Sequence, residues 1–297
     1  MRNDQEMLTL FLDFAAADPR IRAVGMEGSR LNPQVVPDEF QDFDLTYFVT
    51  DLESFTRDDG WLDRFGERLI LQKPEGMELF PPEEPGFSYL MLFADFNKAD
   101  LTLRLLSDLP AYLSEDRLRT ILLDKDGRVP APPVPTDADY WVTPPTARSF
   151  DDCCNEFWNL SHYVVRGICR GELFYAAAHL EAMREELFRM LGWEIGLRRG
   201  FGFGLGKRQK FLPRYLDAER MRALEGSCDT GSLARAEAAL QTLLSLFRES
   251  SRRVAEELGC PYPDYDGKVS RYLDHYLERM KTNAVNQKRD GQNDGRP

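Results

Sequence analysis

The N-terminus of this sequence has no long apolar run. Asp4, Glu6 and Asp13 interrupt its apolar positions, whereas a helix that crosses a membrane needs about 20 mostly apolar residues. A signal peptide also needs an uninterrupted apolar region. We therefore expect no targeting segment and no membrane association, and we predict a cytoplasmic protein.

Cysteine is scarce, and its pattern does not suit a disulfide framework. The chain has five cysteines, an odd number that includes the adjacent Cys153 and Cys154, which predicts free thiols in a reducing compartment. The spacing of Cys153, His162 and Cys169 fits no zinc pattern. Packing of these residues in a helical core is the favoured interpretation.

The chain has fewer positively charged than negatively charged residues. The chain has 38 Lys and Arg against 50 Asp and Glu, a formal net charge of -12. Proteins that hold RNA or DNA need a basic surface, so nucleic acid is not expected as a partner. An acidic surface instead attracts a polycation. We expect a monomer that acts on small molecules.

The chain is long enough for two domains. It has 297 residues, of which 42% are hydrophobic, and this is enough to bury substantial cores. Six prolines between residues 128 and 147 interrupt regular structure. Short strands alternate with helices before this segment, and four amphipathic helices are predicted after it, over residues 151–170, 172–198, 233–258 and 268–281.

These patterns predict an α+β fold in three parts. Residues 1–135 form a domain with a mixed β-sheet and flanking helices, and residues 136–281 form an α-helical bundle. The polar, glycine-containing tail over residues 282–297 is predicted to be disordered.

Two carboxylates lie at the start of a predicted strand over residues 43–49. Asp42 and Asp44 are two residues apart, so their side chains share one face of the strand at a spacing of about 6.6 to 6.8 Å. Both can reach hard cations bound between them. A bound metal ion would explain two like charges on an otherwise apolar strand.

A glycine and a serine precede this strand. Residues 22–26 read as a short strand that ends at Gly28 and Ser29. Glycine lets the backbone approach a phosphate, and the serine hydroxyl can donate a hydrogen bond to it. Taken alone, the Gly-Ser pair can be a simple turn and the two aspartates a solvated strand end.

A third carboxylate follows in a predicted hairpin. Residues 87–93 read as one strand, residues 95–98 as a turn and residues 99–103 as the returning strand. Asp100 is favoured as the third carboxylate, and Asp95 is expected to be a turn residue. A solvent-facing role for Asp100 stays open.

The order Gly28-Ser29, then Asp42 and Asp44, resembles the signature of the DNA polymerase β-like nucleotidyltransferases. More narrowly, residues 27–33, 38–51, 99–103, 152–158 and 200–215 resemble the aminoglycoside 6-adenylyltransferases, the streptomycin adenylyltransferase family. The resemblance runs from about residue 4 to about residue 281. It implies Mg2+-dependent transfer of AMP from ATP to the 6-hydroxyl of streptomycin, release of pyrophosphate and antibiotic resistance.

The resemblance also assigns roles to residues of the first domain. Asp42, Asp44 and Asp100 would hold Mg2+, and Asp100 would also orient or deprotonate the attacking hydroxyl. The expected nucleotide-binding residues near the first strand are Gly28, Ser29 and Arg30.

A glycine-rich segment of the second domain is a further candidate for nucleotide binding. The loop over residues 200–210 contains four glycines and three basic residues, and the resemblance implies that Lys207 and then Lys210 contact the triphosphate. The loop has neither the spacing of a Walker A motif nor its Ser/Thr after the lysine, and it does not match Gly-x-Gly-x-x-Gly. A flexible connection between helices is the alternative.

The acceptor site has the weakest pattern. Carboxylates beside an aromatic platform suit a ring that carries guanidinium groups, and the candidates are Glu156, Trp158, Glu185 and Glu194. Solvated glutamates and a core tryptophan are the alternatives. Residues 158–162 and 174–179 depart from the usual family pattern, which keeps another small acceptor as an alternative. A catalytically silent nucleotide-binding protein is the second alternative, and the presence of all three carboxylates disfavours it.

Overall fold

The computed structural model describes residues 1–80 and 85–293. The chain divides into two compact units, one over Met1–Asp139 and the other beginning at Tyr140. The division lies within the proline-rich segment, close to the boundary that the sequence suggests after residue 135.

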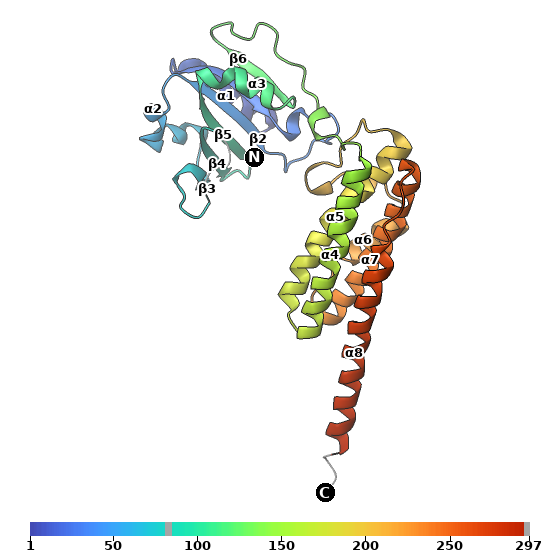
Figure 1. Cartoon of the computed structure of the whole chain (residues 1–297). Coiled ribbons are helices and arrows are strands. Elements are labelled where there is room, and N and C mark those ends of the chain that lie inside the picture. Colours follow the sequence, from blue (N-terminus) through green and yellow to red (C-terminus); the bar gives the residue numbers. More distant parts are fainter. Residues whose placement is uncertain (81–84, 294–297) are drawn as a thin grey trace. The chain divides into compact units, whose positions relative to one another are not determined.

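The first unit is a six-stranded sheet with helices (Figure 1). Its strand order is β3-β4-β5-β2-β1-β6, and β2 and β5 are parallel while the other neighbours are antiparallel. The helices and strands are α1 (Asp4–Ala17), β1 (Ile21–Glu27), β2 (Phe43–Val49), α2 (Glu53–Thr56), β3 (Arg68–Gln72), β4 (Phe87–Phe93), β5 (Lys98–Leu105), α3 (Leu109–Glu115) and β6 (Arg119–Asp124). The predicted mixed sheet with flanking helices is confirmed.

Alternation along β2 divides this unit into layers. Leu45 and Tyr47 point to one face, where they join a core that includes Phe11 of α1. Phe48 points to the other face and packs against Tyr112 of α3, with ring centroids 5.0 Å apart. Asp44 lies on the same face as Phe48 but only partly buried, so the carboxylate is accessible beside a packed core.

The second unit is helical, as predicted. Its long helices share one hydrophobic core, and its helices are α4 (Ala147–Arg170), α5 (Leu173–Arg199), α6 (Ala218–Gly226), α7 (Leu233–Leu258) and α8 (Tyr265–Asn293). Local sequence fixes their ends: Thr146 caps α4 through a capping box, and Gly171 ends it in a left-handed conformation. The short helix α6, which begins after the cap Asp217, was not predicted.

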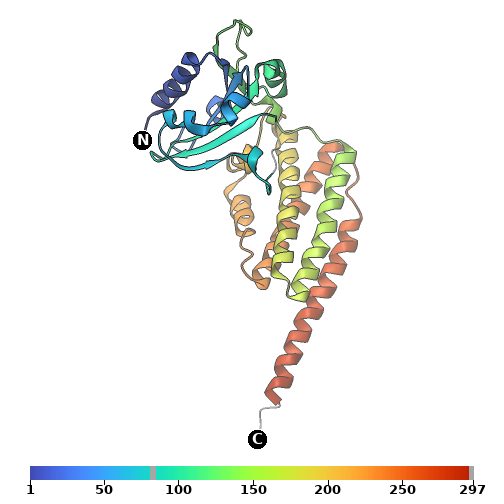
Figure 2. The same cartoon turned by 90° about the vertical axis from the view of Figure 1, so that its left-hand side faces the viewer.

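The C-terminal tail, for which the sequence predicts disorder, contains the end of a helix. Residues 282–293 continue α8 and extend it past the bundle, as Figures 1 and 2 show, and residues 294–297 lie outside the described residues. Leu273 and Leu277 anchor the helix in the core. Between Gly267 and Gly291 no glycine or proline interrupts it, so the helix propagates at little cost per residue.

A helix that spans a membrane must be both long and apolar. In the described part of the chain, no helix meets both conditions.

Candidate functional site

The structure brings Asp42, Asp44 and Asp100 together. Each carboxylate offers one oxygen, and these oxygens all lie within 4.8 Å of one another. Among the described residues this is the one group of three or more His, Cys, Asp and Glu side chains with such spacing. Asp95, the alternative third carboxylate, is instead a turn residue whose side chain accepts a hydrogen bond from Arg2 Nε at 2.7 Å.

The parallel pairing of β2 with β5 explains this convergence. Asp44 lies directly opposite Asp100 in the register, and adjacent strands are about 4.8 Å apart. Asp42 precedes β2 by one residue, so it lies on the same face as Asp44. The three carboxylates therefore come from two neighbouring strands of one rigid sheet.

Arg30 holds the backbone at Asp42. Its Nε donates to the backbone carbonyl of Asp42 at 2.9 Å, and its NH2 donates to that of Gln41 at 2.9 Å. The guanidinium also lies over the ring of Phe43 and pairs with Asp4. Its side chain is 10% exposed, and these contacts hold the segment before β2 in place; the role of Arg30 in nucleotide binding stays a prediction.

Gly28 and Ser29 adjoin the carboxylates. Gly28 has a φ of 81°, and a Cβ at this position would lie 2.1 Å from the Oδ2 of Asp44. Only glycine allows this approach. Gln41 donates to the Oγ of Ser29 at 3.5 Å, and the serine hydroxyl keeps its own proton for donation to a ligand.

The sequence analysis missed two charged neighbours of the carboxylates, Glu27 and Lys98. Glu27 pairs with Asp44 in the β1–β2 register, and Arg119 Nε donates to its carboxylate at 2.7 Å. Lys98 Nζ donates to Asp42 at 2.7 Å and to Asp100 at 2.8 Å. Lys98 could have been predicted from the alternation of side chains along a strand, because it lies two residues before Asp100 and therefore on the same face.

The electrostatic environment of Asp44 is unusual. Burial raises the pKa of Asp44, and the charges of Asp100, Asp42 and Glu27 raise it further, to about 7, against the opposing effect of Lys98. Hydrogen bonds to Asp100 and Asp42 raise the pKa of Lys98, although burial alone lowers it. The group as a whole has more negative charge than its neighbours neutralise.

These residues fit a magnesium ion. Mg2+ binds oxygen ligands at about 2.1 Å, commonly one or two carboxylates together with waters and phosphates. The spacing of the three oxygens, at most 4.8 Å, permits shared ligation. The unfavourable burial of Asp44 beside two like charges gives a cation a stabilising role here.

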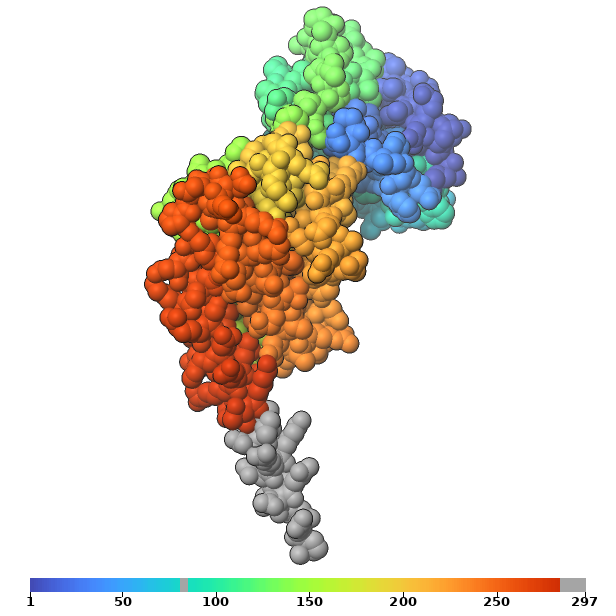
Figure 3. Space-filling view, turned by 90° about the vertical axis from the view of Figure 1, so that its right-hand side faces the viewer, coloured from blue at the N-terminus to red at the C-terminus, as the bar shows by residue number. Residues whose placement is uncertain are grey.

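The glycine-rich loop of the second unit is strongly basic in an acidic protein. No acidic residue occurs between Glu194 and Asp217, and this stretch contains Arg198, Arg199, Lys207, Arg208, Lys210 and Arg214. Lys207 and Lys210 are exposed. Figure 3 shows the chain around residue 200, in yellow, on the surface of the helical unit. This loop can bind an anion.

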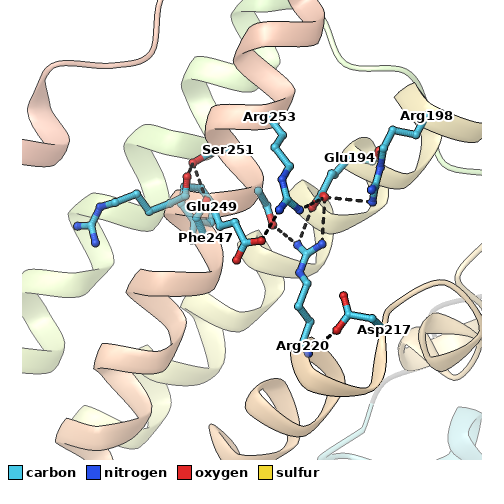
Figure 4. Close-up of polar contacts among 10 residues, drawn as sticks. Glu194, Arg198, Asp217, Arg220, Phe247, Glu249, Ser251 and Arg253 are labelled. Carbon is cyan, nitrogen blue, oxygen red and sulfur yellow. Dashed lines mark hydrogen bonds and ion pairs between the residues drawn. The ribbon is translucent and has the colours of Figure 1, made fainter.

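Two of the predicted acceptor residues are structural. Trp158 is 1% exposed in the helical core, so its ring offers no platform to a ligand. Glu194 is 2% exposed and accepts hydrogen bonds from Arg220, at 2.6 and 3.0 Å, and from Arg253 at 2.8 Å (Figure 4). Burial raises the pKa of Glu194, but these arginines outweigh it and lower the pKa to about 2.

The other two predicted acceptor residues are accessible. Glu156 is exposed on α4, and Glu185 is half-buried on α5. Carboxylates in such positions can accept hydrogen bonds from a cationic ligand.

Nearly the whole chain is similar to known proteins of one family. The family model described as streptomycin adenylyltransferase matches residues 1–276. An aminoglycoside 6-adenylyltransferase of Campylobacter jejuni is 52% identical over 274 residues, which cover 92% of this chain and 95% of that protein. One of Bacillus subtilis (strain 168) is 47% identical over 277 residues, which cover 92% and 98%. A crystal structure of an aminoglycoside 6-adenyltransferase from Bacillus subtilis is 42% identical, covers 93% of this chain and 99% of that chain, and has a TM-score of 0.47.

Proposed function

Because the chain belongs to the streptomycin adenylyltransferase family, we propose that it transfers AMP from ATP to the 6-hydroxyl of streptomycin. The chain is a nucleotidyltransferase, and its relatives support an aminoglycoside as the acceptor. The proposal includes streptomycin as the acceptor, ATP as the donor, a requirement for Mg2+, release of pyrophosphate and a role in antibiotic resistance.

The observation that carries the proposal is the convergence of Asp42, Asp44 and Asp100 on one sheet face. These residues would hold Mg2+, which when bound offsets the negative charge that develops on the α-phosphate and the departing pyrophosphate. Asp100 accepts the proton of the acceptor hydroxyl. The hydroxyl oxygen forms a bond to the α-phosphorus, the bond from that phosphorus to the bridging oxygen breaks, and pyrophosphate leaves.

Nucleotide binding is assigned to Gly28, Ser29, Lys207 and Lys210. Gly28 and the hydroxyl of Ser29 hold the terminal phosphates, since they adjoin the carboxylates and Ser29 keeps a proton to donate. Lys207 and Lys210 add charge to the triphosphate from the basic loop. ATP is abundant in the cytoplasm, which is the proposed location.

The acceptor is a cation. Streptomycin carries two guanidinium groups, and the chain has a net charge of -12. Glu156 and Glu185 are the predicted acceptor carboxylates that remain accessible, and we assign the guanidinium contacts to them.

The deciding experiment measures pyrophosphate release from ATP with a panel of aminoglycosides, and identifies the adenylylated product by mass spectrometry. We expect turnover with streptomycin and Mg2+, and none without the metal. Asp100→Asn should abolish transfer while weakened binding of ATP persists in calorimetry, because the amide cannot accept the proton. Turnover with another aminoglycoside but not with streptomycin would contradict streptomycin as the acceptor. Full activity of Asp100→Asn would show that Asp100 is not the proton acceptor.

A further inference from the structure

Lys98 is bonded to the same carboxylates that are proposed to hold the metal. It begins β5, two residues before Asp100 and on the same face. Its ammonium lies 2.7 Å from the Oδ2 of Asp42 and 2.8 Å from the Oδ2 of Asp100. The side chain is 39% exposed, so it can leave this position without disturbing the core.

The oxygens that Lys98 occupies are the ones a metal ion would need. The Oδ1 of Asp100 is buried, which leaves the Oδ2 for a ligand that arrives from solvent. A lysine ammonium is a compact charge with three donors, and it neutralises the carboxylates without fixing an octahedral geometry. An ammonium and a divalent cation would therefore compete for Asp42 and Asp100.

We propose that Lys98 is a resident counter-cation, which must leave Asp42 and Asp100 before a divalent metal ion can bind there. The consequence is that free metal binds weakly and metal bound to a polyphosphate binds well, because the phosphates give the displaced ammonium a new partner. The inference rests on the proposed function in one respect, the metal-holding role of the carboxylates.

Binding of Mn2+ without nucleotide tests this competition directly. The loss of free Mn2+ signal in electron paramagnetic resonance gives the affinity for the full-length protein. Lys98→Met removes the competitor and should tighten binding by at least about tenfold. Lys73→Met is the matched control, because Lys73 is 37% exposed and pairs with Asp59 at 2.6 Å; it should bind Mn2+ as the wild type does.

Two further variants locate the effect. Lys98→Arg keeps the positive charge and should show wild-type or weaker affinity. Adding Asp42→Asn to Lys98→Met should abolish the gain, because the metal loses a ligand; a gain that survives would lie at another site and overturn the inference. Unchanged or weaker affinity of Lys98→Met would also overturn it, and a weaker affinity would assign Lys98 to positioning the carboxylates for the metal.

A non-hydrolysable ATP analogue provides the second arm. Its presence should raise the Mn2+ affinity of the wild type more than that of Lys98→Met, since only the wild type has an ammonium to transfer to the phosphates. An equal gain in both proteins would contradict the exchange of partners. Neither measurement uses AMP transfer, so a protein with the expected metal binding and no transfer would overturn the proposed function alone.

Discussion

At the scale of single residues, Asp44 reduces the stability of the metal-free protein. Its carboxylate is partly buried beside Asp42, Asp100 and Glu27, and its pKa is raised to about 7. The same group in an unfolded chain has a pKa of about 3.9. The folded protein therefore holds a proton on Asp44 at pH values where the unfolded chain has released it.

We expect the stability of the metal-free protein to fall as the pH rises through this range. Between about pH 4 and pH 7 the native state binds more protons than the unfolded state, so the contribution of Asp44 to the free energy of unfolding decreases with pH. Its full cost, up to about 4 kcal/mol, is reached above pH 7. Urea unfolding at several pH values, in a buffer that contains a metal chelator, measures this change in the free energy of unfolding.

Asp44→Asn isolates this contribution from other titrating groups. The variant should match the wild type near pH 4 and be more stable at pH 8, because asparagine never ionises. A variant that is less stable than the wild type at pH 8 would contradict the assignment.

Metal ligation makes a separate prediction for Asp42→Asn and Asp44→Asn. Each change removes one ligand charge with almost no change in volume, so turnover should drop by at least about 100-fold while the circular dichroism spectrum stays unchanged. Steady-state adenylylation assays at saturating Mg2+ provide the measurement. Near-wild-type turnover in either folded variant would remove that residue from the metal site.

At this scale the sequence predicted the carboxylates but not their partners. Asp42 and Asp44 are recognisable because alternation along a strand gives residues two apart a common face. Asp100 is recognisable from the family resemblance, which implies a third carboxylate on a later strand. Glu27 and Arg30 gain their roles through contacts across strands and loops, with Arg119 and with the carbonyl of Asp42. Such contacts depend on strand order, which no local pattern specifies.

At the scale of elements, the loop over residues 200–210 is expected to act on the nucleotide alone. Lys207→Ala should raise the KM for ATP by about tenfold or more and change the KM for the acceptor little, because the lysine is proposed to touch only phosphate. Initial rates with each substrate varied in turn separate the two constants. An effect confined to the acceptor would assign the loop to the acceptor.

The ion-pair cluster between α5, α6 and α7 makes a prediction about stability. Glu194→Gln leaves Arg220, which is 8% exposed, without its carboxylate partner. Removing one member of a buried ion pair typically costs about 3 to 5 kcal/mol, and chemical denaturation should show a loss of this size. Glu185→Gln, on the accessible side of the same helix, is the control and should change stability by less than about 0.5 kcal/mol.

Helix periodicity predicted the long helices but not the surroundings of their polar residues. The apolar faces over residues 151–170 and 233–258 match α4 and α7 closely. In the sequence Glu194 is a candidate acceptor residue with a solvated glutamate as the alternative, whereas in the structure it is paired with arginines of two other helices. Its burial depends on how the helices pack, and the chain around it gives no local signal.

At the scale of the whole molecule, each unit has its own hydrophobic core. We therefore expect two transitions in differential scanning calorimetry. Mg2+ with a non-hydrolysable ATP analogue should raise the transition of the first unit more than that of the second, because a ligand stabilises what binds it and the first unit contains the proposed metal ligands. Scanning residues 1–139 and residues 140–297 as separate proteins assigns the transitions. A single transition that no ligand shifts would contradict this expectation.

The position of β5 between β4 and β2 also fixes when the site can form. A nascent chain that has reached the end of β2 contains Gly28, Asp42 and Asp44, yet it lacks the strand that carries Asp100. The parallel contact closes only after β3, β4 and β5 have been synthesised and the crossover is complete. A metal ion held by all three carboxylates would then join late in folding, so it would lengthen the lifetime of the native state and leave the folding rate almost unchanged.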